Sequence, residues 1–386
     1  MYDEDLAENE LRDLMLAVDV PPSRADVRRA TVTGRRQARR RTIITGGTAG
    51  IAVLAAVGTV VAFGPVWAGS HGRLTGLGVP STPPTSAPAG RCTPAELPLP
   101  SGVTDVVVTA IDPTGTIVAG DGGAQQTTPI LWKDGKAEVL PGVSGTVVAV
   151  SADGTVVGYA TNSQDDSTGW VYRNGKATNL AKLSGYKWTN PNAIDARGDI
   201  AGWVHGTSLD DTVPVVWSAD GVARRLTVPH GVGNAGENAV MARDIGDNGS
   251  VVGFAHGVPM LWKPGATPLE LPPGVTTGAA DAIAGHYAYG TAGAYPARWN
   301  LDTGKVTLLQ SVGDVGAKDG TEDGTALLPA TDPGKVSLLV REDGRTDPLT
   351  GPKGAPAVAL AVSTDGSTVV GMTAADPPHP LLWRCR

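Results

Sequence analysis

The longest apolar stretch of the chain runs from Ile43 to about Trp67, and residues 42–72 contain no Asp, Glu, Lys or Arg. About 20 apolar residues, each rising roughly 1.5 Å, span the ~30 Å hydrocarbon core of a bilayer. In lipid the backbone polar groups must pair within the segment, which requires a helix. We therefore expect residues 42–68 to form one transmembrane helix.

Basic residues lie mainly on the N-terminal side of this segment. Five arginines precede it between residues 35 and 41, whereas Arg73 and Arg91 alone follow it before residue 92. The positive-inside bias predicts a single-pass protein of the cell membrane, with its N-terminus in the cytoplasm. A cleaved signal peptide is the alternative, because Val66 and Ala68 satisfy a small-residue cleavage rule, but 41 residues are long for its leader. Either way, residues 92–386 are expected to be exported.

The predicted cytoplasmic segment, residues 1–41, changes sign along its length. Residues 1–19 contain seven acids and one Arg, and residues 23–41 contain eight Arg and one acid. Leu6, Leu11 and Leu14 fall close to helical spacing, which favours a short amphipathic helix. The segment is either a topology signal with a solvated helix or a docking helix for a cytoplasmic protein.

Beyond a Gly-, Ser-, Thr- and Pro-rich linker at residues 69–91, the apolar pattern repeats itself. The clearest unit is Pro-x-x-Trp followed by a Gly-containing turn. Its anchors are Trp132, Tyr172, Trp217, Trp262, Trp299, Val340 and Trp383, with spacings of 40, 45, 45, 37, 41 and 43 residues. Tyr172 and Val340 occupy the slot in two weaker copies. The six aromatic anchors are expected to form blade core.

Each copy contains four short apolar runs separated by turns such as Asp153-Gly154 and Asn174-Gly175. Asp-Gly and Asn-Gly supply the positive φ angles that tight hairpins need. Four strands at a period of about 40–45 residues are typical of a propeller blade. The sequence therefore predicts that residues 92–386 form an all-β, seven-bladed β-propeller.

The two ends of the repeat predict how the ring closes. The last copy stops after its third strand, at Trp383-Arg384-Cys385-Arg386. Residues 95–100 resemble the fourth strand of the first copy, residues 137–141. We expect this N-terminal strand to complete the seventh blade and Cys92 to bond Cys385 across the seam, as an exported protein allows.

The repeated unit resembles the extracellular HAF-type and WD40-like propeller repeats over residues 92–386, although no copy contains His-Ala-Phe and no strand contains Trp-Asp. Those families mostly serve as interaction platforms, so the resemblance implies a binding role. Residues 1–41 resemble the segments before the membrane helix of actinobacterial membrane-bound anti-sigma factors. The zinc-binding His/Cys pattern of one such family is absent, because residues 1–70 contain neither His nor Cys.

Composition narrows the possible chemistry. The net charge of −7 argues against nucleic acid as a partner of the whole chain. The six His residues are scattered without metal-ligand spacing. There is also no Gly-x-Ser-x-Gly elbow and no Gly-rich phosphate loop before a helix. We expect no catalytic residue, no metal and no cofactor.

The repeat also predicts where a ligand binds, because the loop after the second strand and the loop between blades emerge on one face of a propeller. The longest such loops belong to blades two to four and carry aromatic, acidic and amide side chains suited to a sugar, a peptide or a cation. These candidates are Asp165, Asp166, Tyr186, Lys187, Trp188, His205, Asp210, Asp211, His230, Asn234, Glu237 and Asn238. Trp188 and Trp203 lie outside the repeated Trp position. The alternative is that these long loops are simply polar and solvated.

Three functions remain open on the sequence alone. The first is a non-enzymatic binding or scaffold module with a protein, peptide or glycan partner outside the membrane. The second is a transmembrane sensor that regulates a cytoplasmic protein, such as a sigma factor, through residues 1–41. The third is a propeller hydrolase or lyase, which single changes at His205, Asp211 or Glu237 would have to inactivate.

Overall fold

Strand pairing in the computed structural model follows the sequence repeat. The model describes residues 92–161, 167–207, 211–233, 239–263, 265–309, 316–330 and 335–386. The predicted cytoplasmic segment, transmembrane helix and linker lie outside these residues. Within the described ranges, no helix is long and apolar enough to cross a bilayer.

The described strands form seven four-stranded antiparallel sheets, which confirms the predicted seven-bladed propeller. Blade one consists of β2 (Val107–Ile111), β3 (Ile117–Gly122), β4 (Thr128–Lys133) and β5 (Lys136–Val139). Blade two consists of β6 (Thr146–Val150), β7 (Val156–Thr161), β8 (Ser167–Arg173) and β9 (Lys176–Asn179). Blade three consists of β10 (Trp188–Ile194), β11 (Ile200–His205), β12 (Thr212–Trp217) and β13 (Ala223–Arg225). Blade four consists of β14 (Val240–Ile245), β15 (Val251–Ala255), β16 (Val258–Lys263) and β17 (Gly265–Pro268). Blade five consists of β18 (Gly278–Ala284), β19 (Tyr287–Ala292), β20 (Tyr295–Asn300) and β21 (Val306–Leu308). Blade six consists of β22 (Asp319–Gly320), β23 (Ala326–Leu328), β24 (Ser337–Val340) and β25 (Thr346–Leu349).

Blade seven joins the two ends of the propeller. Its strands are β26 (Ala357–Val362), β27 (Thr368–Thr373), β28 (Pro380–Cys385) and, from the other end, β1 (Cys92–Glu96). Cys92 lies opposite Cys385 in the register and forms a disulfide with it. The predicted disulfide and the N-terminal strand in blade seven are confirmed, but this strand is formed by residues 92–96 and not by residues 95–100. A short 3₁₀ helix, η2 (Pro352–Gly354), precedes β26.

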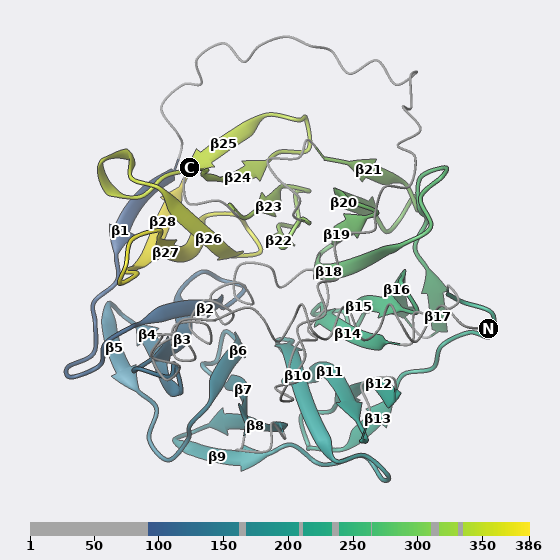
Figure 1. The fold of residues 1–386 in the computed structure, drawn as a ribbon, viewed down its shortest axis with the longest axis horizontal. Helices are drawn as coiled ribbons and strands as arrows, with labels where there is room; N and C mark the ends of the chain where they lie inside the picture. The colour runs from purple at the N-terminus through teal and green to yellow at the C-terminus, as the bar shows by residue number, and fades with distance from the viewer. Residues whose placement is uncertain are drawn as a thin grey trace, which may run out of the picture. The chain divides into compact units, whose positions relative to one another are not determined.

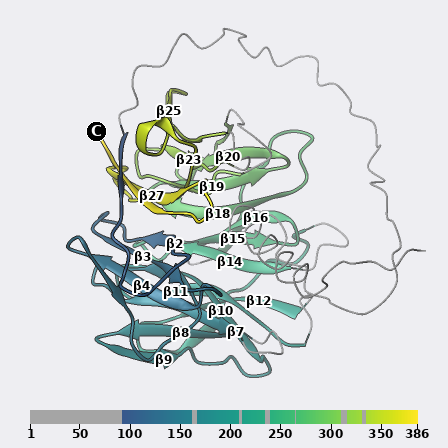
Figure 2. The same ribbon diagram turned by 60° about the vertical axis from the view of Figure 1, so that its left-hand side comes forward.

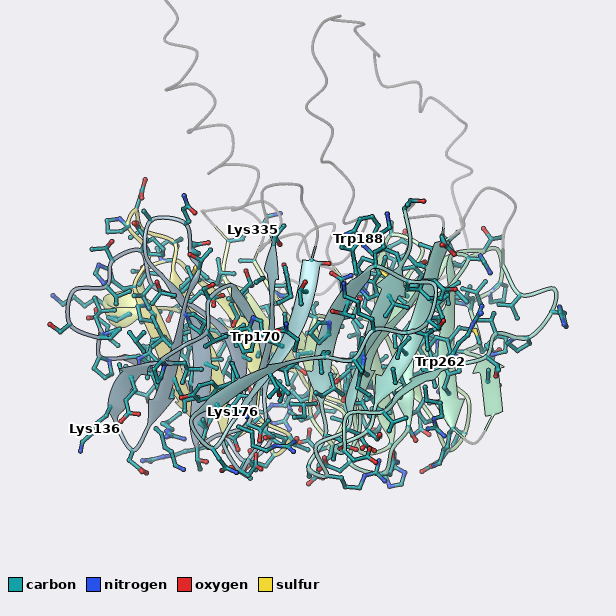
Figure 3. The ribbon with its side chains drawn as sticks, turned by 90° about the horizontal axis from the view of Figure 1, so that it is seen from below. Lys136, Trp170, Lys176, Trp188, Trp262 and Lys335 are labelled. Atoms are coloured by element: carbon teal, nitrogen blue, oxygen red, sulfur yellow. A yellow bond between two sulfur atoms is a disulfide. The ribbon has the colours of Figure 1, made fainter. Side chains whose placement is uncertain are left out.

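The seven sheets surround one central axis, with β2, β6, β10, β14, β18, β22 and β26 innermost (Figures 1 and 2). Turns between the first and second strands, and between the third and fourth, share one side of the ring, which we call the turn face. Connections between the second and third strands, and between blades, share the other, the loop face. Figure 3 shows Trp188 and Lys335 toward the loop face, and Lys136 and Lys176 toward the turn face.

The repeated Trp residues join each blade to the one before it. Their side chains are almost fully buried, with Trp217, Trp299 and Trp383 at 0% exposure. Each indole Nε1–H donates to a backbone carbonyl just after the outer strand of the preceding blade. The pairs are Trp132 with Pro98, Trp217 with Ala181, Trp262 with Thr227, Trp299 with Glu270 and Trp383 with Thr350, at 2.6–2.7 Å. Tyr172 is also buried in its blade, in a cluster with Trp170.

The tight turns follow the prediction only in part. Asp134-Gly135 and Asn174-Gly175 have positive φ at both residues, as two-residue hairpins require. At Asp153-Gly154 and Asp343-Gly344 only the glycine has positive φ. There the aspartate side chain accepts the backbone N–H two residues later, at Thr155 and Arg345. These are longer turns stabilised by an aspartate side chain.

A glycine in the second strand recurs because of a β-bulge in the first. Six innermost strands shift register by one residue, at Thr109, Val148, Asn192, Arg243, Asp281 and Leu360. The opposing glycines are Gly120, Gly158, Gly202, Gly253, Gly290 and Gly371. A Cβ at any of them would lie 2.0–2.3 Å from a carbonyl oxygen of the first strand. The bulge therefore excludes a side chain at that position.

Gly253→Ala is expected to lower the free energy of unfolding by about 1–3 kcal/mol, the usual cost of overpacking a core. The new methyl group would lie 2.0 Å from the Met241 carbonyl oxygen, which is backbone and cannot rotate away. Denaturant unfolding of the two proteins measures the difference.

Gly265→Ala is the matched control. Neither glycine has positive φ, but the nearest atom to a Cβ at Gly265 is 3.9 Å away. Its stability should stay the same or rise slightly. Equal losses at the two positions would contradict the role given to the bulge.

Candidate functional site

The structure places six of the twelve predicted ligand-face residues within its described ranges. Asp165, Asp166, Asp210, Asn234, Glu237 and Asn238 lie outside them. Tyr186 and Lys187 belong to the connection between blades two and three, and Trp188 begins β10. His205 ends β11, and Asp211 precedes β12. His230 is exposed in the connection between blades three and four.

Three aromatic rings from this set and its surroundings lie in a row, which we call the aromatic row. The centroids of Trp188 and His205 are 4.4 Å apart, and those of Trp203 and His205 are 5.1 Å apart. The Nζ of Lys187 lies 5.8 Å from the Trp188 ring centroid, a cation–π distance. All three rings are half-buried. The row therefore presents aromatic surface that is neither blade core nor fully solvated.

A cavity of about 280 Å³ lies on the loop face between blades three and four. Its polar lining consists of Tyr186, Asp211, Thr212, Arg225 and His256. Leu226, Val228 and Val240 supply apolar lining. Tyr186 and Asp211 were predicted from sequence to face a ligand, and the structure brings both to this cavity. Lys187, Trp188 and His205 are not part of its lining, and neither is His230.

Arg225 and His256 line the cavity, although neither is among the ligand-face residues predicted from loop length. Arg225 ends the outer strand β13, and His256 lies in a two-residue turn with Gly257, both with positive φ. Loop length selected the long connections, whereas these residues belong to a strand end and a short turn. The signal available in the sequence is their position in the repeat, because both positions face the same side as the long loops.

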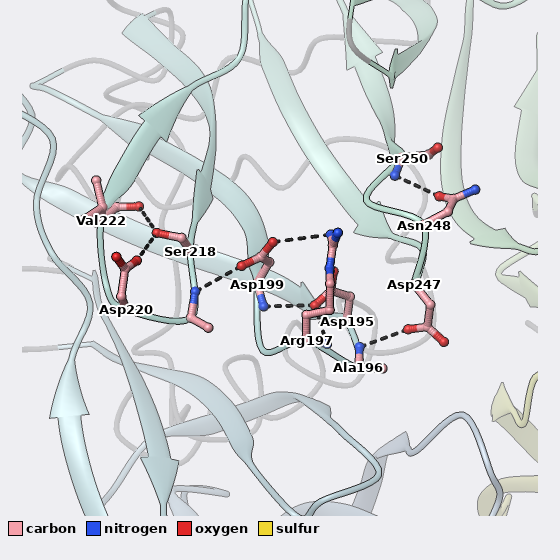
Figure 4. Close-up of polar contacts among 11 residues, drawn as sticks. Asp195, Ala196, Arg197, Asp199, Ser218, Asp220, Val222, Asp247, Asn248 and Ser250 are labelled. Carbon is pink, nitrogen blue, oxygen red and sulfur yellow. Dashed lines mark hydrogen bonds and ion pairs between the residues drawn. The ribbon is translucent and has the colours of Figure 1, made fainter.

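Polar groups of the turn face mostly bond the backbone of their own turns (Figure 4). Asp195 Oδ1 accepts the backbone N–H of Arg197 and Asp199, and its Oδ2 pairs with the Arg197 guanidinium at 2.8 Å. Asp247 accepts the Ala196 N–H, and Asn248 accepts the Ser250 N–H. Asp247 and Asn248 are thus both used in hydrogen bonds to backbone N–H groups.

Several buried carboxylates link one blade to the next. Asp244 accepts the N–H of Ile283 in blade five at 2.8 Å, and Asp319 accepts that of Val362 in blade seven at 2.9 Å. Burial raises the pKa of Asp244 to about 7 and that of Asp319 to about 6, against the lowering effect of these N–H donors. Asp121, which accepts the Val147 N–H, has a pKa raised by the same cause.

Stability is expected to fall as the pH rises from about 4 to about 7, because the folded pKa values of Asp244, about 7, and Asp319, about 6, exceed the ordinary 3.8. In that window the folded chain holds protons that the unfolded chain has released. The effect is fully stabilising below the unfolded pKa and is lost as the pH passes the folded pKa. We expect a loss of about 1–3 kcal/mol in the free energy of unfolding.

Asp244→Asn keeps an acceptor oxygen without the charge and should reduce this slope, leaving the part due to Asp319. Denaturant unfolding across the pH range measures the slope. Asp220→Asn is the control, because Asp220 is exposed and its hydrogen bond with Ser218 lowers its pKa, outside the window. If stability depends on pH equally in Asp244→Asn and in the wild type, Asp244 is not a source of the pH dependence.

Comparisons with known proteins identify the fold. No protein-family model matches the chain. No curated protein matches its sequence. The extracellular domain of a putative one-component system, BT4673 from B. thetaiotaomicron, is 8% identical with a TM-score of 0.50 and covers 75% of this chain. A chain of a mitotic checkpoint complex is 14% identical with a TM-score of 0.48, covering 78% of this chain and 96% of that one. The likeness to the BT4673 domain is one of fold. This chain spans 39% of the length of the BT4673 chain.

Proposed function

We propose that the protein is a membrane-anchored, extracytoplasmic β-propeller that acts as a non-enzymatic binding or scaffold module. Residues 42–68 anchor it, residues 1–41 lie in the cytoplasm, and the loop face at blades two to four contacts the partner. In this proposal the propeller binds its partner and does not transform it.

The observation that carries the proposal is the contrast between the two faces of the propeller. On the turn face, the polar groups of Figure 4 bond their own turns or a neighbouring one. On the loop face, aromatic residues outside the repeated Trp position lie beside a cavity with mixed polar and apolar lining. A concave site with aromatic walls and a few convergent polar groups is the usual form of a binding site.

The disulfide supports the extracytoplasmic placement. Disulfides persist in oxidising compartments and are rare in the cytosol of most organisms. Cys92 and Cys385 are the chain's two cysteines, and they are bonded to each other. An arginine cluster before residue 42 and an uncharged stretch after it give the same orientation.

The test is a pull-down with the intact protein in detergent and, in parallel, with residues 92–386 alone, read by mass spectrometry. We expect a partner that both forms retain. Tyr186→Ala combined with Lys187→Ala should release it, because these residues lie at the loop-face site. Lys136→Ala combined with Lys176→Ala, on the turn face, is the matched control.

Two outcomes would contradict the proposal. A partner retained equally by the loop-face variant would move the binding surface elsewhere. A cytoplasmic partner seen only with the intact chain, and lost when Leu11 and Leu14 become Asp, would make the protein a transmembrane sensor.

A further inference from the structure

The aromatic row and the cavity share one side of the blade-three sheet. Trp188 lies opposite His205, and His205 lies opposite Thr212, so their side chains project from the same face of the sheet. Trp203 is two residues before His205 on the same strand and projects the same way. Thr212 also lines the cavity and accepts the Val240 N–H of blade four. The row thus runs directly to the cavity edge.

Among the described residues, His205 and Lys187 lie against the Trp188 ring. The His205 ring is 4.4 Å from the Trp188 ring, tilted by 32°, and 5.1 Å from the Trp203 ring. Over Trp188 lies the Lys187 ammonium, at 5.8 Å from the ring centroid. Lys187 is exposed and has a long flexible stem, so a ligand can displace it from the ring and then accept its hydrogen bonds.

The charges at the site disfavour a strongly charged ligand of either sign. Lys187 and Arg225 oppose a cation, and Asp211 opposes an anion. Tyr186 and Thr212 add hydroxyl groups that both donate and accept, and His256 adds an imidazole. This set suits a neutral ligand with many hydroxyl groups and an apolar ring face.

The size of the cavity limits how much of a ligand it encloses. At about 280 Å³ it lies just below the ~300–1,000 Å³ of pockets that enclose a whole drug-sized ligand. It therefore suits one ring of a longer molecule that continues over the aromatic row.

From these features we infer that the site binds a glycan, with one sugar ring in the cavity and the next stacked on Trp188. The C–H groups of the sugar ring pack on the indole face, because the electron-rich face attracts their weakly positive hydrogen atoms. Asp211 accepts sugar hydroxyls, and Arg225 and Lys187 donate to sugar oxygens. This inference rests on the proposed function and names the partner class of the same site.

The test uses the full-length protein labelled with 5-fluorotryptophan and observed by fluorine NMR. The probes are tetrasaccharides of glucose, mannose, galactose and N-acetylglucosamine at millimolar concentration. At least one is expected to shift the Trp188 resonance, assigned from Trp188→Phe, and to leave the Trp262 resonance in place, since Trp262 is blade core.

Calorimetry then measures the affinity of variants for the probe that shifts Trp188. Trp188→Ala should weaken binding about tenfold or more, as removal of an aromatic anchor does. Asp211→Ala changes an exposed residue and should weaken binding without unfolding the protein. Tyr295→Ala removes an exposed aromatic side chain from the loop face of blade five and should leave affinity unchanged.

Two results would overturn the inference: no probe shifts the Trp188 resonance, or Trp188→Ala and Asp211→Ala both bind as the wild type does. The proposed function has a separate readout, because a photo-crosslinker at Lys187 captures a protein partner as well as a glycan. Capture of a protein without any sugar response would reject the glycan and keep the binding face. If there is neither a sugar response nor a crosslinked product, both the glycan inference and the proposed binding face are rejected.

Discussion

Replacing Cys92 and Cys385 by serine is expected to lower the free energy of unfolding by up to about 5 kcal/mol. The disulfide joins residues 293 positions apart, so it removes much of the freedom of the unfolded chain. It also holds β1, a five-residue strand, as the outer strand of blade seven. Without it, strand pairing with β28, packing around Trp383 and the hydrogen bond from Trp132 to the Pro98 carbonyl still hold this segment.

Denaturant unfolding under oxidising and reducing conditions measures this contribution. The double serine variant is the control, since a chain without cysteines cannot respond to reductant. Amide hydrogen exchange in β1 and β28 should speed up on reduction more than in blades two to five. If reduction leaves both stability and exchange unchanged, the seam does not depend on the disulfide.

Trp217→Ala is expected to cost about 3–5 kcal/mol, as large-to-small changes at buried aromatic residues do. The Trp217 side chain is completely buried among residues of blades two and three. Its indole also donates to the Ala181 carbonyl of the preceding blade at 2.7 Å. The change therefore removes both packing and a link between blades.

Trp188→Ala is the matched control in the same blade. Trp188 is half-buried on the loop face, and its substitution should cost about 1 kcal/mol or less. Thermal and denaturant unfolding of the two variants separate a structural tryptophan from a binding one. Similar losses at both positions would show that the aromatic row is part of the blade core.

The sequence predicts the architecture well because a propeller repeats one physical problem seven times. Each blade must bury a large residue against its neighbour, and Trp132, Trp217, Trp262, Trp299 and Trp383 recur for that reason. The unpaired third strand at the C-terminus and the spare strand at the N-terminus predict the seam, because an edge strand left open exposes unpaired backbone groups.

Other features of the fold and the site become visible only in the three-dimensional structure. Gly253 and its counterparts read as strand residues, and only the register shift opposite them shows that a Cβ would collide with a carbonyl oxygen. Asp244 reads from sequence as a residue beside a turn, yet it bonds a backbone N–H in the next blade. Which residues meet at the cavity depends on how blades three and four pack, so the repeat positions of Arg225 and His256 predict their side of the ring but not that they line this cavity.

Photo-crosslinking in living cells tests most directly whether the loop face is the binding face. A benzoylphenylalanine at Lys187 is compared with one at Lys176, which is also exposed but lies toward the turn face (Figure 3). The account predicts a crosslinked product from position 187 and none from position 176. A product from position 176 alone, or from both positions equally, would contradict it.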